Sequence, residues 1–162
     1  MEETEMRPYR CLLSLLALLT SLGLCGGLAQ TDHITAFTGT WKLNLSKSKF
    51  NPGPPFKSFT LAFTPDGVRH LDLVGADGQS LNVALPWSDG LEVTPTGQGM
   101  EDTKVISKIQ GKTVEDTWRR NGTVIEKVHG SISSDGKTLT MNVEGPRLPA
   151  DTFRNQVVFD KQ

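Results

Sequence analysis

The chain has little of what several protein classes require. Its 162 residues carry 17 basic and 18 acidic side chains, giving a formal net charge of -1. Proteins that bind nucleic acid through its phosphates need a basic excess, so we expect no nucleic-acid partner. The 16 glycines and 9 prolines are too few for a collagen-like or low-complexity chain. The length fits one domain with a single core.

Long apolar runs are confined to the N-terminus. Residues 11–24 are almost wholly apolar, and Gly27-Leu28-Ala29 places small residues where signal peptidase cuts. We therefore predict a cleaved signal peptide over residues 1–29, export to the periplasm or the extracellular space, and no transmembrane span. A start at Met6 rather than at Met1 would give the basic opening that is usual in such leaders.

Cysteine is absent after the predicted leader. Cys11 and Cys25 both lie within it, so the remaining domain has no disulfide and no thiol nucleophile. The alternative to plain secretion is a lipoprotein anchored through Cys25, because residues 22–25 resemble a lipobox. Without residues 1–29, 15 basic and 15 acidic residues remain, so the mature chain is neutral.

Turn signals recur at regular spacing after the leader. Asp-Gly, Asn-Gly and Gly-Lys pairs separate short runs rich in Val, Ile, Leu, Thr and Phe, at residues 66–67, 77–78, 89–90, 111–112, 121–122 and 135–136. Such pairs supply the positive φ of tight hairpins, so they predict antiparallel strands. No convincing helical stretch follows the leader.

The loops also predict which residues lie opposite each other. In the first half the expected pairs are Phe63 with Arg69, Leu73 with Leu81, Trp87 with Leu91 and Leu85 with Val93. In the second half they are Ser107 with Asp116, Asp116 with Glu126, and Val128 with Val143. One face stays largely apolar throughout, which is the pattern of a sheet with one buried face.

About ten strands connected as nearest neighbours predict an all-β, antiparallel up-and-down barrel over residues 39–162. An even strand count lets the first and last strands pair and removes the sheet edges. A two-layer sandwich is the alternative, since it shares the same alternation. Residues 30–38 would be a flexible segment ahead of the barrel.

A few polar side chains interrupt the inward face. They are Arg69, Ser107, Asp116, Glu126 and Asn155, with Trp118 on the same face. Ser107, Asp116 and Glu126 are expected in one cross-strand row, where two carboxylates would raise one pKa or recruit a cation such as Arg69. These side chains would be ligand anchors or a self-satisfied polar network, unless a β-bulge turns them outward.

The pattern gives little support to catalysis. His33, His70 and His129 lack zinc-site spacing, and no nucleophile elbow or phosphate loop is present. A carboxylate pair can serve hydrolysis, but no aromatic platform flanks this one. We therefore expect no enzyme, no catalytic residue, no cofactor and no metal.

The first strand carries a family resemblance. Gly39-Thr40-Trp41-Lys42-Leu43 resembles the Gly-x-Trp signature of lipocalins and fatty-acid-binding proteins. With residues 39–55, 134–140 and 157–162, the chain is similar to a family of uncharacterised, exported bacterial lipocalin-like proteins. The resemblance implies a small barrel in which Trp41 plugs one end beneath an internal cavity. It also implies a late-strand arginine against that Trp, matched by Arg154, which our register places on the outer face.

The sequence thus favours an exported barrel that binds a small apolar or amphipathic ligand in an internal cavity. Its predicted lining residues are Arg69, Ser107, Asp116, Trp118, Glu126 and Asn155. The alternatives are a filled barrel acting as a structural or protein-interaction module of the cell envelope, and a hydrolase using the carboxylate pair. A binding cavity needs on the order of 300 Å³ or more, so volume separates the first two.

Overall fold

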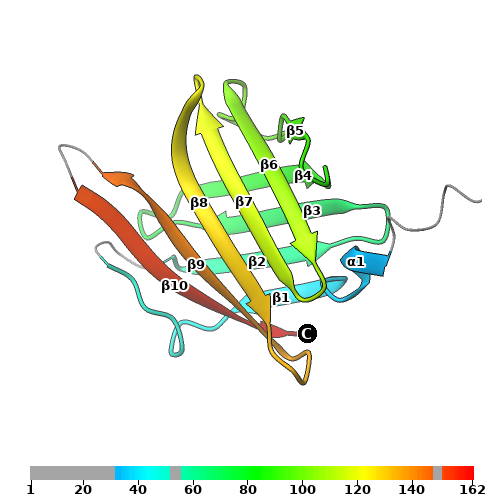
Figure 1. The fold of residues 1–162 in the computed structure, drawn as a ribbon. Coiled ribbons are helices and arrows are strands. Elements are labelled where there is room, and N and C mark those ends of the chain that lie inside the picture. Colours follow the sequence, from blue (N-terminus) through cyan, green and yellow to red (C-terminus); the bar gives the residue numbers. More distant parts are fainter. Residues whose placement is uncertain (1–31, 52–55, 148–150) are drawn as a thin grey trace, which may run out of the picture. The chain divides into compact units, whose positions relative to one another are not determined.

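The computed structural model describes residues 32–51, 56–147 and 151–162. The predicted signal peptide and the alternative lipid anchor at Cys25 lie outside the described residues. A single turn of helix, α1 (Asp32–Thr35), precedes ten strands (Figure 1). These are β1 (Gly39–Leu43), β2 (Ser58–Phe63), β3 (Val68–Val74), β4 (Ser80–Pro86), β5 (Glu92–Val93), β6 (Thr103–Gln110), β7 (Thr113–Arg120), β8 (Thr123–Ile132), β9 (Thr138–Arg147) and β10 (Asp151–Lys161).

The strands form one antiparallel sheet in the order β4-β3-β2-β1-β10-β9-β8-β7-β6-β5. The first and last strands pair in the middle of the sheet, with Trp41 opposite Lys161, and leave β4 and β5 as the two edges of a nearly closed barrel. In Figure 1, β6, β7 and β8 cross in front of β2, β3 and β4. The predicted all-β barrel of about ten strands is confirmed.

The predicted hairpin between β4 and β5 is wrong. These two strands are the opposite edges of the sheet, so Trp87 does not pair with Leu91, nor Leu85 with Val93. Asp89 and Gly90 do take positive φ, 41° and 85°, but their turn leads the chain across to β6, where the Gly90 amide bonds to Ser107. The turn residues determine the local backbone geometry, whereas the pairing of the next segment depends on the arrangement of the whole sheet.

A small bridge joins the two sheet edges. The amides of Ala84 and Thr96 each donate to the other's carbonyl at 2.8 Å. Thr96 lies just after β5, so this contact, rather than a continuous ladder, brings the chain after β5 against β4.

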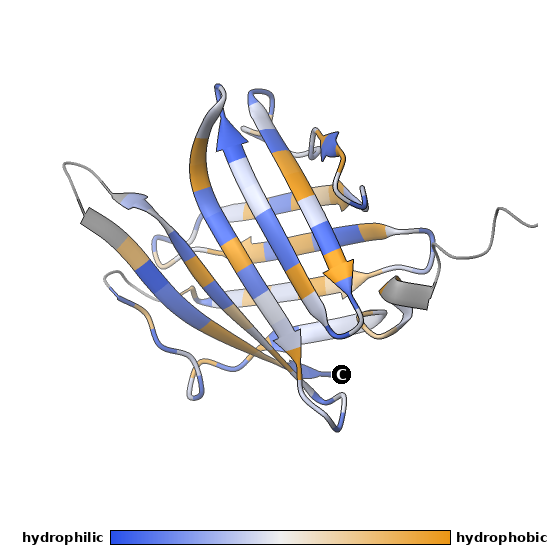
Figure 2. Cartoon of the chain, viewed as in Figure 1, coloured by the Kyte–Doolittle hydropathy of each residue, from blue (hydrophilic) through white to orange (hydrophobic). Residues whose placement is uncertain are grey.

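Elsewhere most of the predicted register is confirmed. The structure pairs Phe63 with Arg69, Leu73 with Leu81, Ser107 with Asp116, and Val128 with Val143. Apolar and polar residues alternate along these strands, as Figure 2 shows most clearly for β6, β7 and β8.

The pairing of β7 with β8 differs from the prediction. Asp116 lies opposite Val128, and Glu126 lies opposite Trp118. Asn121 and Gly122 both take positive φ, 49° and 77°, which makes a two-residue turn where we expected three residues. A β-bulge between Trp118 and Arg119 then absorbs one residue, so Glu126 stays on the inward face two positions further along.

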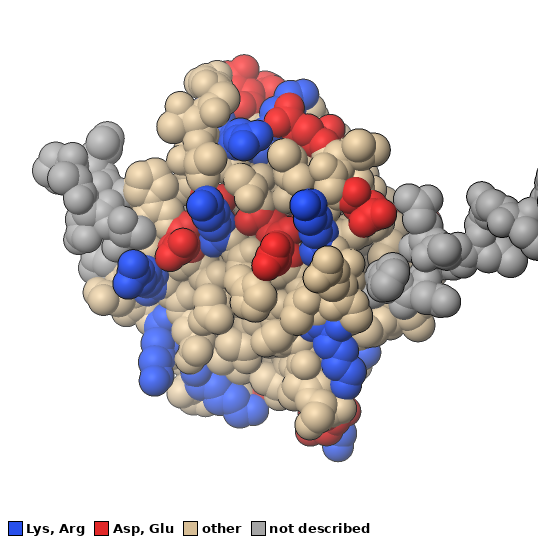
Figure 3. Space-filling model, viewed as in Figure 1, with Lys and Arg blue, Asp and Glu red and all other residues tan. Residues whose placement is uncertain are grey.

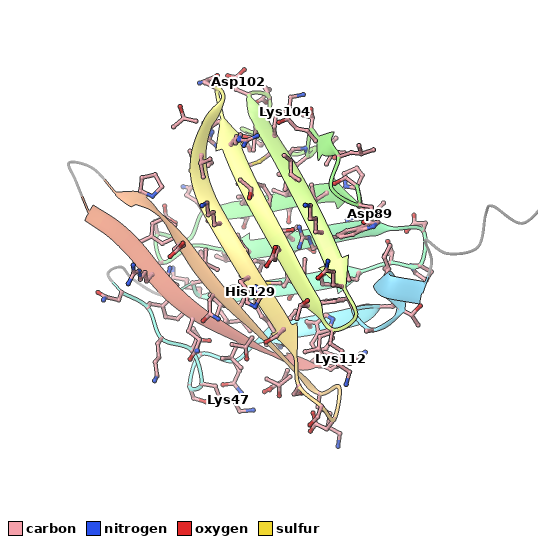
Figure 4. All side chains as sticks on the ribbon, in the orientation of Figure 1. Lys47, Asp89, Asp102, Lys104, Lys112 and His129 are labelled. Carbon is pink, nitrogen blue, oxygen red and sulfur yellow. The ribbon has the colours of Figure 1, made fainter. Side chains whose placement is uncertain are left out.

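At one end of the barrel, here called the closed end, large inward-facing side chains are fully buried. It contains the α1 segment, the C-terminus and the β6–β7 turn that carries Lys112 (Figures 1 and 4). Trp41 is completely buried there and its indole donates to the Phe37 carbonyl at 2.7 Å. Phe37 is also completely buried, so residues 30–38, expected as a flexible segment, add a side chain to the core.

The other end, here called the open end, carries the turn with Asp102 in Figure 4. Inward-facing apolar side chains of β2, β3, β4, β9 and β10 are only half-buried there. They are Phe59, Leu71, Leu73, Leu81, Val143 and Phe153. On the same strands, the inward residues toward the closed end are buried: Leu61, Phe63, Leu85, Leu139 and Phe159.

Candidate functional site

A buried ion pair crosses the barrel interior. Arg69 of β3 and Asp116 of β7 approach to 2.8 Å between Nη1 and Oδ2, and their side chains are 7% and 3% exposed. The Ser107 hydroxyl of β6 donates to the other Asp116 oxygen, Oδ1, at 2.6 Å. The structure therefore brings together three of the predicted site residues in a network that satisfies both carboxylate oxygens.

Arg69 is also in contact with an aromatic ring and a small void. Its guanidinium carbon lies 5.6 Å from the centroid of the Phe63 ring, and its Nη2 is buried without a hydrogen-bond partner among the described residues. An adjoining cavity bounded in part by Arg69 and Ser107 measures about 10 Å³. That is roughly the space of one water molecule, so this cavity does not admit an organic ligand.

Glu126 is a second inward carboxyl, and it has no ion pair or hydrogen bond among the described residues. It lies opposite Trp118 and is half-buried. Burial, and then the charge of Asp116, raise the pKa of Glu126 to about 7, while Arg69 opposes the rise. Near neutral pH this side chain therefore exchanges between a neutral and a charged form.

The remaining predicted residues occupy separate positions. Trp118 is buried, and its indole N–H has no acceptor among the described residues. Asn155 of β10 is half-buried opposite Val143, and its side-chain oxygen accepts from the Asn51 amide at 2.9 Å. Trp41 lies at the closed end. The predicted set thus divides into the deep network, Glu126 opposite Trp118, Asn155 on β10, and the core residue Trp41.

Sequence reasoning missed a polar groove on the outer face of β7 to β10. It measures about 690 Å³ and is lined mainly by side chains that alternate outward, including Glu115, Lys127, His129, Glu144 and Arg154. Glu115 pairs with His129 at 3.5 Å, and Glu144 with Arg154 at 3.8 Å. Acidic and basic side chains alternate across this face in Figure 3, and Figure 4 labels His129. The signal for this groove in the sequence was the charged residues at the outward positions of the same strands.

Arg154 does not take the place that the resemblance implies. Its side chain is 78% exposed in the outer groove. Lys161 covers Trp41 instead, with Nζ 4.9 Å from the ring centroid. The cation over the buried Trp therefore comes from the last residues of β10.

Comparison of the chain with protein-family models, curated proteins and solved structures found no match. The assignment of the site therefore depends on geometry alone. Within residues 32–51, 56–147 and 151–162, no three His, Cys, Asp or Glu side chains are grouped as a metal site would need. None of the helical structure in that part of the chain is long and apolar enough to cross a membrane. The fold and interior define a nearly closed ten-stranded barrel with one open end and a buried ion pair.

Proposed function

We propose that this barrel binds a small amphipathic molecule at its open end. The apolar tail would lie against the half-buried side chains of β2, β3 and β4, and the polar head would lie near Glu126 and Asn155. One observation carries the proposal: on β2, β4, β9 and β10, inward-facing apolar side chains are buried toward the closed end and only half-buried toward the open end. A barrel filled only for structural reasons would gain stability by burying both ends.

The buried network of Arg69, Asp116 and Ser107 would form the inner boundary of the proposed site. Arg69 and Ser107 occupy both oxygens of Asp116, and the void beside them holds roughly one water. A ligand therefore stays above this network rather than filling the whole barrel. The proposed site would therefore lie in the outer half of the interior.

The cellular address belongs to the same proposal. The apolar run over residues 11–24 and the small residues at 27–29 support export. The Gly39-to-Leu43 segment, which resembles the lipocalin signature, supports a carrier rather than an enzyme. We propose a protein that holds an amphipathic molecule outside the cytoplasm, with a lipid anchor at Cys25 as the alternative to free secretion.

Native mass spectrometry of residues 30–162, purified from the exported fraction without detergent, tests the proposal. We expect a reproducible adduct of small-molecule mass. Leu81→Ser at the open end should remove it, because a hydroxyl in the tail site weakens apolar contact. Leu91→Ser is the matched control, since Leu91 is 72% exposed and lies outside the barrel interior. An apo mass that persists after incubation with a lipid extract would contradict binding.

The outer groove supports a second candidate function, a protein-interaction module. Its volume of about 690 Å³ lies within the range of ligand sites, but its lining is polar and charged. In this case Lys127→Glu should abolish the capture of a specific envelope protein, while Leu81→Ser should leave capture unchanged. The opposite pattern would favour the internal site.

A further inference from the structure

We propose that the head group bound at the open end is a cation, an ammonium on an apolar tail, held between the Glu126 carboxylate and the Trp118 indole. The inference rests on the proposed function, because it names the ligand class of the same site. It follows from the charges that face inward and from the contacts these charges already make.

Among the described residues, the barrel interior contains two carboxyls, Asp116 and Glu126, and one cation, Arg69. Arg69 and Asp116 neutralise each other at 2.8 Å, and Ser107 occupies the second oxygen of Asp116. Glu126 is left without an ion pair or a hydrogen bond among the described residues. A carboxylate that is removed from water needs a proton or a cation, and a bound ammonium would supply the cation.

Trp118 provides a second and independent observation. It lies directly opposite Glu126 across the β7–β8 ladder, on the inward face, and is 9% exposed. Its indole N–H lacks an acceptor among the described residues, but an ammonium cannot accept a hydrogen bond, so it is the indole ring and not the N–H that bears on a cationic ligand. An indole face next to a carboxylate is a favourable environment for ammonium groups, because the ring quadrupole attracts cations.

The same charges disfavour an anionic head. The charged groups that face Glu126 from the neighbouring strands are Asp116 on β7 and Arg69 on β3, and Arg69 is already paired. The inward residues Val143 of β9 and Asn155 of β10 carry no charge. A ligand carboxylate would therefore be repelled by Glu126, because the charge of Arg69 is already balanced by Asp116. The raised pKa of Glu126, about 7, agrees with a site that lacks its counter-charge.

Three decyl probes with the same tail test this inference: decyltrimethylammonium, decanoate and 1-decanol. The two ionic probes are titrated below their micelle concentrations and the alcohol below its solubility limit, while tryptophan fluorescence is recorded. We expect the cation to bind at least about tenfold more tightly than the other two. Glu126→Gln should remove this preference, so that the cation and the alcohol bind alike. Glu115→Gln on the outer face is the control and should retain the preference.

The wild-type protein provides a test that does not depend on any variant folding. Because Glu126 titrates near pH 7, the affinity for the cation should rise about tenfold between about pH 6 and about pH 8. Equal binding of all three probes, or a preference for decanoate, would overturn the ammonium proposal and leave the binding function intact. If none of the three probes binds to the wild-type protein at any pH tested, the proposed function itself fails.

Discussion

At the scale of single residues, the barrel interior shows how a charge can be buried. The guanidinium of Arg69 is almost inaccessible to water, and its stability there depends on Asp116 and, through Asp116, on Ser107. Such a pair contributes little net stability compared with apolar packing, because both charges lose their hydration. Removing one partner is costly, however, since it leaves the other charge buried and uncompensated.

Asp116→Asn tests this dependence. The substitution keeps the shape but leaves Arg69 unpaired, so we expect the free energy of unfolding to fall by about 3–5 kcal/mol in urea denaturation. The double variant Arg69→Met with Asp116→Leu should recover most of the loss. Glu144→Gln, which breaks the exposed pair with Arg154, should cost less than about 1 kcal/mol. Equal effects of Asp116→Asn and Glu144→Gln would contradict a buried, coupled pair.

Glu126 predicts an unusual pH dependence of stability. Its pKa is about 7 in the folded chain against an ordinary 4.5, so the folded state binds the proton more tightly than the unfolded state. The free energy of unfolding should therefore fall as the pH rises from about 4.5 to about 7, by about 2–3 kcal/mol, and then level off.

Urea denaturation at about pH 5 and about pH 8 measures this slope, which Glu126→Gln should flatten. Hydrogen bonds from Ser133 and Asn44 lower the pKa values of Asp135 and Asp160, so those carboxyls titrate below this range. Glu115→Gln serves as the control and should keep the wild-type slope. An unchanged slope in Glu126→Gln would mean that another group titrates here.

At the scale of elements, the sequence periodicity predicted the sheet face of each side chain better than it predicted the residue that lies opposite on the neighbouring strand. The alternation placed Arg69, Asp116 and Glu126 inward, and the structure agrees. The predicted partner of Glu126 was wrong because the β7–β8 turn is shorter than expected and because a β-bulge lies between Trp118 and Arg119. Each of these changes which residues lie opposite each other, and bulges leave no clear trace in a single sequence. Which residues pair depends on the geometry of the turn, whereas the face that a side chain occupies depends only on whether its position along the strand is odd or even.

Two other features of the structure could not be predicted from the sequence pattern, because they depend on tertiary contacts. The turn at Asp89-Gly90 has hairpin residues, yet its flanking strands lie on opposite edges of the sheet, which only the closure of the whole barrel determines. The short α1 segment was missed because a single turn has no periodicity to detect. Its contribution, the buried Phe37, comes from tertiary packing.

The contact between the two sheet edges depends on Gly97. Its φ is +149°, and a Cβ added there would lie 2.4 Å from the Asn82 carbonyl oxygen. Gly97→Ala should therefore push the 94–97 segment away from β4 and cost about 1–3 kcal/mol of unfolding free energy. Gly99→Ala is the matched control, because its φ is also positive but no atom lies within 4 Å of the added Cβ.

Amide hydrogen exchange localises the effect of this change. In Gly97→Ala, the amides of Ala84 and Thr96 should exchange faster than in wild type, because their mutual hydrogen bonds open. In Gly99→Ala they should keep their protection. If Gly97→Ala leaves both amides protected, the edge contact does not depend on this glycine.

At the scale of the whole molecule, the difference between the two ends links fold to function. The closed end combines Trp41, Phe37 and Phe159, all completely buried, with the C-terminal Lys161 over the Trp41 ring. That end holds the three largest fully buried side chains of the described residues. The open end can then expose apolar side chains without loss of the fold, as a reversible binding site requires.

Accessibility along a single strand measures this difference. In a chain in which Cys11 and Cys25 are replaced by Ser, Leu81→Cys at the open end of β4 should react with a maleimide at least about tenfold faster than Leu85→Cys, which replaces a side chain that is 1% exposed. Leu91→Cys gives the rate of a fully exposed thiol. Decyltrimethylammonium should slow labelling at position 81 alone, because only there does a bound tail cover the thiol. Equal labelling at 81 and 85 would show that both ends are packed alike, and the binding site would then have to lie in the outer groove.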